Sequence, residues 1–151
     1  MLKTRVPPPL VTAFFAALMW LVAPYAPVVV IREDTRLGLS LISLVLGIVL
    51  CLAGVVSFKK SQTTVNPLAP DRASQLVDSG VYRISRNPMY LGMALFLLAW
   101  ACYLPSLWTV LGVVAFIGYM NHYQIAPEER ALKKLFGDQF RAYKRRVRRW
   151  I

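Results

Sequence analysis

The sequence predicts an all-α membrane protein with four transmembrane helices followed by C-terminal interfacial amphipathic helices. Of the 151 residues, 57% are hydrophobic, and the mean hydropathy is +0.50. Soluble domains have only about 45–50% apolar residues. Runs without a charged residue cover 6–31, 37–58 and 89–127, whereas Lys and Arg dominate the tail 127–151. These features exclude a soluble globular domain and favour a single membrane domain over 1–151.

The charge-free runs are long enough for four spans. A transmembrane helix needs about 20 apolar residues, so the first two runs supply one span each and the third supplies two. The third run then contains a tight outer turn at Pro105–Ser106. The expected spans are 10–30, 38–58, 89–104 and 106–125.

The first run also has features of a signal peptide, because a basic start precedes a short apolar stretch. However, Pro24 and Pro27 make a poor cleavage site, and the apolar run continues to Ile31. We therefore expect an uncleaved span that the two prolines kink or end.

The charged residues predict the topology. The net charge is +2 before the first span, 0 in the first loop, +3 in the loop 59–88 and +6 after residue 127. With four spans, all the net charge lies on one side, which the positive-inside rule assigns to the cytoplasm. We expect a multi-pass protein with both termini cytoplasmic, in a bacterial inner membrane.

The basic tail KRRVRRWI could also indicate nucleic-acid binding. Beside a membrane span, such a run is more simply explained by topology and by attraction to anionic headgroups. The expected partners are therefore membrane lipids and not nucleic acid.

The loop 59–88 leads directly into the third span. Its polar part, 61–79, contains Asn-Pro and Ala-Pro pairs that favour turns, and we expect it to be ordered, as a lid. The Asn87 side chain can cap the first free N–H groups of a helix, and Pro88 suits the first helical position. With Arg83 and Arg86 beside it, this helix start predicts an anion site at the membrane edge.

The third and fourth spans form a hairpin that returns the chain to the same membrane face. At 1.5 Å per residue, they are about 24 and 30 Å long. Glu128 and Glu129 should therefore reach the face that carries Arg86 and Tyr90. His122, about two turns before Glu129, should lie slightly deeper under the same site.

The tail reads as two amphipathic helices separated by Gly137, with Asp138 able to cap the second. We expect this segment to lie on the bilayer, with Trp150 as an anchor at headgroup level, and it could also cover the polar site. The two apolar stripes are Leu132, Leu135 and Phe136, then Phe140, Tyr143 and Val147.

Small residues within the spans are interpreted as packing residues. Gly47 and Gly54 lie two turns apart on one helix face, which allows close helix contact. Cys51 and Cys102 have no CxxC spacing and no His or Asp partner nearby, so we expect buried thiols and no metal site.

The predicted polar site combines a cationic helix start, a carboxylate pair, a histidine and tyrosines. It suits a ligand that carries both charge signs and an aromatic portion. Arg86 would hold a carboxylate, Glu128 or Glu129 an ammonium or hydroxyls, and Tyr90 or Tyr82 would stack or face a cation. Taken separately, Asn87–Pro88 is equally well a simple helix cap, and the glutamates an acidic first helical turn.

Three motifs in order carry a resemblance to a known family. GVYRISRNPMYLG at 80–92 is followed by the Glu128–Glu129 pair and by FGDQFRAYKRRVRRW at 136–150. Together they resemble the isoprenylcysteine carboxyl methyltransferase and phospholipid methyltransferase superfamily of integral membrane enzymes, over roughly the C-terminal half. TTVNP at 63–67 is similar to the loop that precedes this core.

The resemblance implies S-adenosylmethionine as cofactor and a set of residues around it. Arg86 and Glu129 would be catalytic, and no metal is required. Many members have His where this chain has Asn87, so a proton-acceptor role is not carried over to that position. The cofactor pocket would be lined by Arg86, Asn87, Pro88, Tyr90, Gly92, Glu128 and Glu129, with Tyr82 and His122 added by position.

The expected function is methyl transfer from cytosolic S-adenosylmethionine to a lipophilic acceptor that enters from the bilayer, as in isoprenylcysteine carboxyl O-methyltransferases. Alternatives are a phospholipid or small-molecule N- or S-methyltransferase of the same fold, and a non-catalytic four-helix membrane protein. An ion transporter is disfavoured, because the spans carry no ionisable residue apart from His122 near one end.

Overall fold

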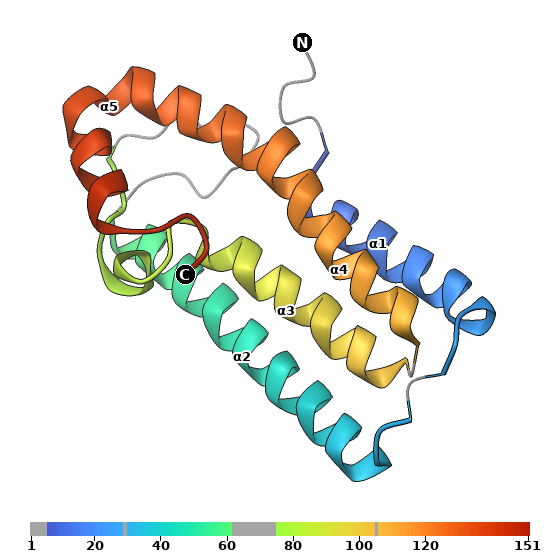
Figure 1. Ribbon diagram of the computed structural model, residues 1–151. Coiled ribbons are helices and arrows are strands. Elements are labelled where there is room, and N and C mark those ends of the chain that lie inside the picture. The colour runs from blue at the N-terminus through green and yellow to red at the C-terminus, as the bar shows by residue number, and fades with distance from the viewer. Residues whose placement is uncertain (1–5, 29, 62–74, 105) are drawn as a thin grey trace.

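The computed structural model describes residues 6–28, 30–61, 75–104 and 106–151. Over these ranges the chain is helical, and the only β-structure is an isolated bridge between Val28 and Ser106. The expected lid loop and the 63–67 motif fall largely or wholly outside the described residues, as does Pro105 of the expected outer turn. Four helices run side by side in Figure 1: α1 (Pro8–Val22), α2 (Glu33–Lys60), α3 (Pro88–Tyr103) and α4 (Leu107–Tyr119).

Within the described residues, two helices are long and apolar enough to cross a membrane. They are α1 together with the short helix η1 (Ala23–Tyr25), and α2. The first of them stops at Tyr25, short of the expected end at residue 30, and α1 gives way to η1 in the region of Pro24, where a kink or an end was expected. The helices found at the other two expected spans are shorter than these: α3 has 16 residues and α4 has 13. At 1.5 Å per residue, α3 is about 24 Å long, less than the roughly 30 Å of a bilayer's hydrocarbon core.

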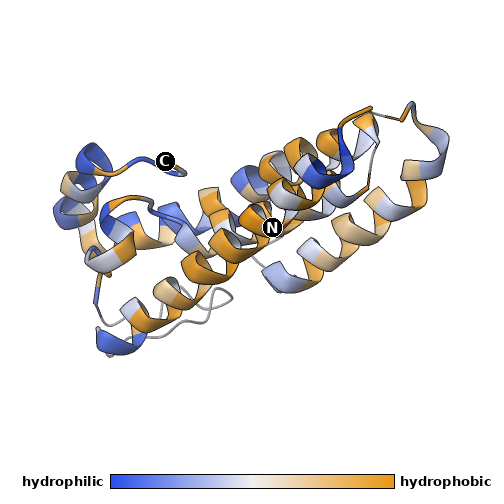
Figure 2. Ribbon diagram, turned by 90° about the horizontal axis from the view of Figure 1, so that it is seen from below, coloured by the Kyte–Doolittle hydropathy of each residue, from blue (hydrophilic) through white to orange (hydrophobic). Residues whose placement is uncertain are grey.

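Helix α3 is the centre of the bundle and packs against α1, α2 and α4. The main apolar core joins α1, α3 and α4, and its most buried side chains include Met19, Leu97 and Phe116. Trp100 of α3 also donates from Nε1 to the Ala16 carbonyl, at 3.1 Å. In Figure 2, apolar residues dominate these helices, while hydrophilic residues gather most at the end that carries the C-terminus.

Helices α2 and α3 approach each other closely through glycines. A Cβ added at Gly47 would lie 2.8 Å from the Gly92 carbonyl oxygen, and one at Gly54 would lie 2.5 Å from Met89 Cγ. The packing role predicted for Gly47 and Gly54 is therefore confirmed. Gly92 likewise faces the backbone of α2, and its predicted place in a cofactor pocket stays a prediction.

The chain continues without a break from α4 through a π-helix, η4 (Met120–Ile125), into α5 (Ala126–Arg146). Gly137 has φ +48° and ψ −115°, which confirms the predicted break and divides α5 into two arms. After Arg146 the last five residues, 147–151, return to the start of α3 (Figure 1). We call this segment the C-terminal strap.

The apolar stripes of the tail pack within the protein, except for Leu135, which is exposed. Phe140, Tyr143 and Val147 form a second core with Leu132 and Phe136, and Leu76 joins them. Trp150 is not free to anchor at the headgroups as predicted. Its ring packs against the main core, and its Nε1 donates to Asn121 Oδ1 at 3.1 Å. The main core of the bundle offers the Trp150 ring an apolar surface within the protein.

The glycine contact gives a stability prediction. An alanine Cβ at residue 92 would lie 2.6 Å from Cys51 Sγ and 2.7 Å from the Gly47 oxygen, so the helices would have to separate. We expect Gly92→Ala to lower the free energy of unfolding by about 1–3 kcal/mol.

Gly118→Ala is the matched control in α4, because among the described residues no atom outside the local helix backbone lies within 4 Å of the added Cβ. Alanine favours a helix over glycine by about 1 kcal/mol, so this variant should keep or raise the melting temperature. Thermal unfolding in detergent compares the two variants. A Gly92→Ala protein that melts like wild type would contradict a tight α2–α3 contact.

Candidate active site

Three segments meet at the polar end of the bundle: the start of α3, the start of α5 and the C-terminal strap. The first segment supplies Arg86 and Tyr90, and the second supplies Glu128 and Glu129. The hairpin formed by α3 and α4 therefore brings these four residues together, as the sequence predicts. The strap contributes Arg149, which the sequence analysis did not select.

Glu128 has uncharged partners. Tyr90 donates its hydroxyl to Glu128 Oε1 at 2.5 Å, and Gln124 Nε2 donates to the same oxygen at 3.0 Å. Among the described residues, no cation pairs with Glu128. Gln124 lies four residues before Glu128 on the same helical face, a spacing that could have identified it from the sequence.

Glu129 is surrounded by cations. Arg149 binds it in a bidentate pair, with Nε 3.1 Å from Oε1 and Nη2 2.8 Å from Oε2. Arg86 Nη2 lies 3.1 Å from Oε1, and Lys144 Nζ lies 3.5 Å from Oε2. The Glu129 side chain is only 13% exposed. Three cations around one carboxylate leave an excess of positive charge at this point.

Arg86 uses only part of its guanidinium. Its side chain is 10% exposed, and Nη2 pairs with Glu129. Nε and Nη1 are buried and have no hydrogen-bond partner among the described residues. Since buried polar groups in proteins are nearly always hydrogen-bonded, two such donors on one cation indicate a place for an anionic acceptor.

Asn87 lies at the N-cap position, but the predicted side-chain cap is absent. Its Nδ2 donates instead to the Arg149 carbonyl at 2.9 Å, and its backbone N–H donates to Ser85 Oγ at 3.1 Å. The side-chain amide of Asn87 is therefore hydrogen-bonded to the C-terminal strap and not to the start of α3. Pro88 begins α3 as predicted and is buried there, so it shapes the helix start.

His122 does not join the cluster. Its side chain is exposed, and its ring lies against Tyr123. The hydrogen bonds of a π-helix span five residues instead of four, which changes the direction of the residues in η4 relative to Glu129. Asn121 accordingly accepts from Arg149 Nη1 at 3.4 Å, in addition to Trp150. No pattern along the chain predicts this π-helix.

Tyr82 lies in the short helix η3 (Gly80–Arg83), which packs against α2. Its ring is buried and meets Phe58 edge-on, and its carbonyl accepts from the Tyr143 hydroxyl at 2.8 Å. Burial, with Tyr143 and Glu128 nearby, raises the pKa of the Tyr82 phenol. These contacts hold the segment that leads into Arg86.

The two glutamates differ in acidity. Burial raises the pKa of Glu128 to about 7, although hydrogen bonds from Tyr90 and Gln124 work against this shift. Burial also acts to raise the pKa of Glu129, but Arg149 and Arg86 outweigh it and hold that pKa below its ordinary value. Burial lowers the pKa of Arg86, and Arg149 adds to this effect. Glu129 is therefore a fixed anion, while Glu128 can exchange a proton near neutral pH.

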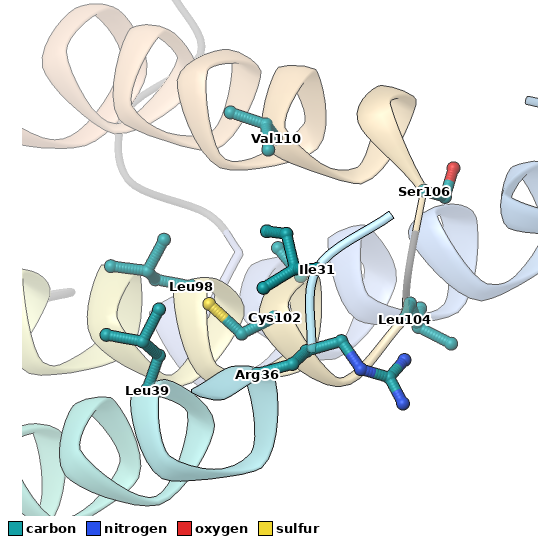
Figure 3. A pocket seen from close by; sticks show the side chains of 9 residues that line it. Ile31, Arg36, Leu39, Leu98, Cys102, Leu104, Ser106 and Val110 are labelled. Carbon is teal, nitrogen blue, oxygen red and sulfur yellow. The ribbon is translucent and has the colours of Figure 1, made fainter. Parts of the chain in front are cut away.

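A cavity of about 110 Å³ lies between α2, α3 and α4, far from this cluster. Leu39, Leu98, Cys102 and Val110 give it a mainly apolar lining, with Arg36 at one side (Figure 3). Cys102 follows Tyr90 by twelve positions, or about 18 Å along a helix. The cavity is therefore separate from the polar cluster.

Comparison with known proteins identifies the family. Residues 35–139 match the family described as phospholipid methyltransferase. A protein of Haemophilus influenzae, described only as an uncharacterized protein, is 49% identical over 63 residues, which are 42% of this chain and all of that protein. No solved structure matches the chain.

The helical fold and its long apolar helices are those of a membrane protein, with a cluster of arginines and glutamates at one end. The chain belongs to the phospholipid methyltransferase family, and so to the superfamily of integral membrane methyltransferases. The family resemblance predicted from the sequence motifs is therefore confirmed.

The pKa of Glu128 predicts how stability depends on pH. Between its ordinary value of 4.5 and about 7, the folded protein retains a proton that the unfolded chain has lost. Stability should therefore fall as pH rises through this window, by up to about 3 kcal/mol, and then level off. We expect Glu128→Gln to remove most of this slope in melting curves recorded from pH 5 to 8.

Glu33→Gln, which changes an exposed glutamate at the start of α2, is the control and should keep the wild-type slope. Parallel wild-type and Glu128→Gln curves would show that Glu128 does not titrate in this range.

Proposed function

We propose that this protein transfers a methyl group from S-adenosylmethionine to a lipophilic acceptor at the cytosolic face of the membrane. In this proposal, α1 to α4 all cross the bilayer, and both termini lie in the cytoplasm. The charge distribution supports that topology, because the polar site and the basic α5 share one end of the bundle.

The observation that carries the proposal is the pair of buried N–H groups on Arg86 without a partner among the described residues. Nε–H and the Nη1 hydrogens lie on different edges of the guanidinium, so they can donate to separate acceptor atoms, and the oxygen of a carboxylate is a strong acceptor for such a charged N–H group. The amino-acid end of S-adenosylmethionine carries such a carboxylate. Its ammonium and ribose hydroxyls need acceptors. Glu128, which accepts from the Tyr90 hydroxyl, is the neighbour in sequence of Glu129, the partner of Arg86.

When bound, S-adenosylmethionine supplies a methyl group on a sulfonium, which is already activated for displacement. The protein then needs mainly to hold the two reactants in line and close together. Arg86 would bind the ligand, and Glu129 would hold Arg86 in place. Glu128, with its pKa of about 7, could accept a proton if the acceptor is an amine, whereas a carboxylate or thiolate acceptor needs no base.

The acceptor is proposed to enter from the bilayer, because the site lies at the end of apolar helices. O-methylation of a prenylated or acylated carboxylate is the first candidate. Methylation of a phospholipid amine, or of a small apolar amine or thiol, is the alternative. The family description agrees with a membrane methyltransferase in either case.

Calorimetric binding of S-adenosylhomocysteine to detergent-purified protein tests the proposal. Hydrogen bonds to a charged group contribute about 1.5–3 kcal/mol, so Arg86→Gln should raise the Kd about tenfold to a hundredfold. Arg145→Gln removes an exposed arginine of α5 and is the matched control, expected to bind like wild type.

A folded wild-type protein that binds neither S-adenosylhomocysteine nor S-adenosylmethionine would contradict the proposal and favour a non-catalytic membrane protein. Equal affinities for wild type and Arg86→Gln would show that the ligand carboxylate does not bind to Arg86.

A further inference from the structure

The C-terminal strap holds the backbone of the segment that carries Arg86. The Arg86 N–H donates to the Arg148 carbonyl at 3.0 Å. The Arg149 carbonyl accepts from Asn87 Nδ2 at 2.9 Å, across 62 residues of sequence. Trp150 anchors the strap to the bundle through Asn121 and the main core. The C-terminal strap therefore helps to position Arg86 in the site.

The side chain of Arg149 makes a separate contact, with Glu129. Its bidentate pair occupies both carboxylate oxygens, and Arg86 is left with one bond, from Nη2 to Oε1. An arginine beside a free carboxylate normally forms the bidentate pair itself. Arg86 would then spend a second donor on Glu129 and offer less of its guanidinium to any other anion.

We infer that Arg149 is a positioning residue of the proposed S-adenosylmethionine site, which keeps two N–H groups of Arg86 available by occupying Glu129. This inference rests on the proposed function and names a residue that acts through another. Arg149 competes with Arg86 for one carboxylate, and the strap delivers Arg149 to the place where it can compete. The end of the chain is thus part of the site that binds the ligand.

The substitution of Arg149 tests this competition in the full chain. In Arg149→Gln, Arg86 can close on Glu129 in a bidentate pair, so the Kd for S-adenosylhomocysteine should rise about tenfold. Arg149→Lys should restore only part of the affinity, because an ammonium binds as a single point and leaves one Glu129 oxygen to Arg86. Arg145→Gln removes an exposed arginine of α5 and is the matched control, expected to bind like wild type.

A double-mutant cycle with Glu129→Gln separates competition from a direct ligand contact. A neutral amide forms no ion pair with Arg86, so Arg149→Gln should have little further effect in that background. Equal loss of affinity in both backgrounds, full rescue by Arg149→Lys, or wild-type binding by Arg149→Gln would each overturn the inference.

A measurement without ligand distinguishes failure of this inference from failure of the proposed function. In protein with ¹⁵N-labelled arginine, the Arg86 Nε–H resonance is assigned by its loss in Arg86→Gln. It should shift in Arg149→Gln and stay unchanged in Arg145→Gln. If wild type binds no S-adenosylhomocysteine, the proposed function fails, but a shifted resonance still shows that Arg149 controls the pairing of Arg86. An unshifted resonance overturns the inference whatever the ligand does.

Discussion

The carboxylate of Glu129 joins parts of the chain that are far apart in sequence. It meets Arg86 from the loop before α3, Lys144 from the second arm of α5 and Arg149 from the strap. A carboxylate that is mostly removed from water is stable only when cations or hydrogen bonds replace its hydration. The polar end of the molecule therefore has one arrangement in which these segments all satisfy the same group.

The adjacent Glu128 has different surroundings because its side chain points in another direction. Successive residues on a helix point about 100° apart, so two neighbouring carboxylates face different surroundings. Glu128 faces Tyr90 and Gln124, which donate hydrogen bonds without charge. One acid thus stays ionised and holds the structure together, while the other remains able to take up a proton. Such a division is typical of sites where two acids serve different functions.

The apolar half of the molecule sets the position of this polar end. Glycines allow α2 to contact the backbone of α3, and the core of α1, α3 and α4 fixes the hairpin that returns the chain to Arg86. The π-helix then turns the chain so that Gln124 and Asn121 face the cluster. A small change of register in η4 therefore decides which side chains reach the site.

The sequence by itself determined the apolar helices, the start of α3 at Pro88, the break at Gly137 and the meeting of Arg86 and Tyr90 with the glutamate pair. These features depend on hydrophobic runs, on backbone preferences of Pro and Gly, and on the length of a helical hairpin, all of which are local. Only the tertiary structure decided the partners of Asn87, the exposure of His122, the packing of Trp150 and the pairing of Arg149 with Glu129. Those outcomes depend on competition between groups that are distant in sequence, and on one additional residue in a helical turn. Neither this competition nor the additional residue produces a recognisable pattern in the sequence.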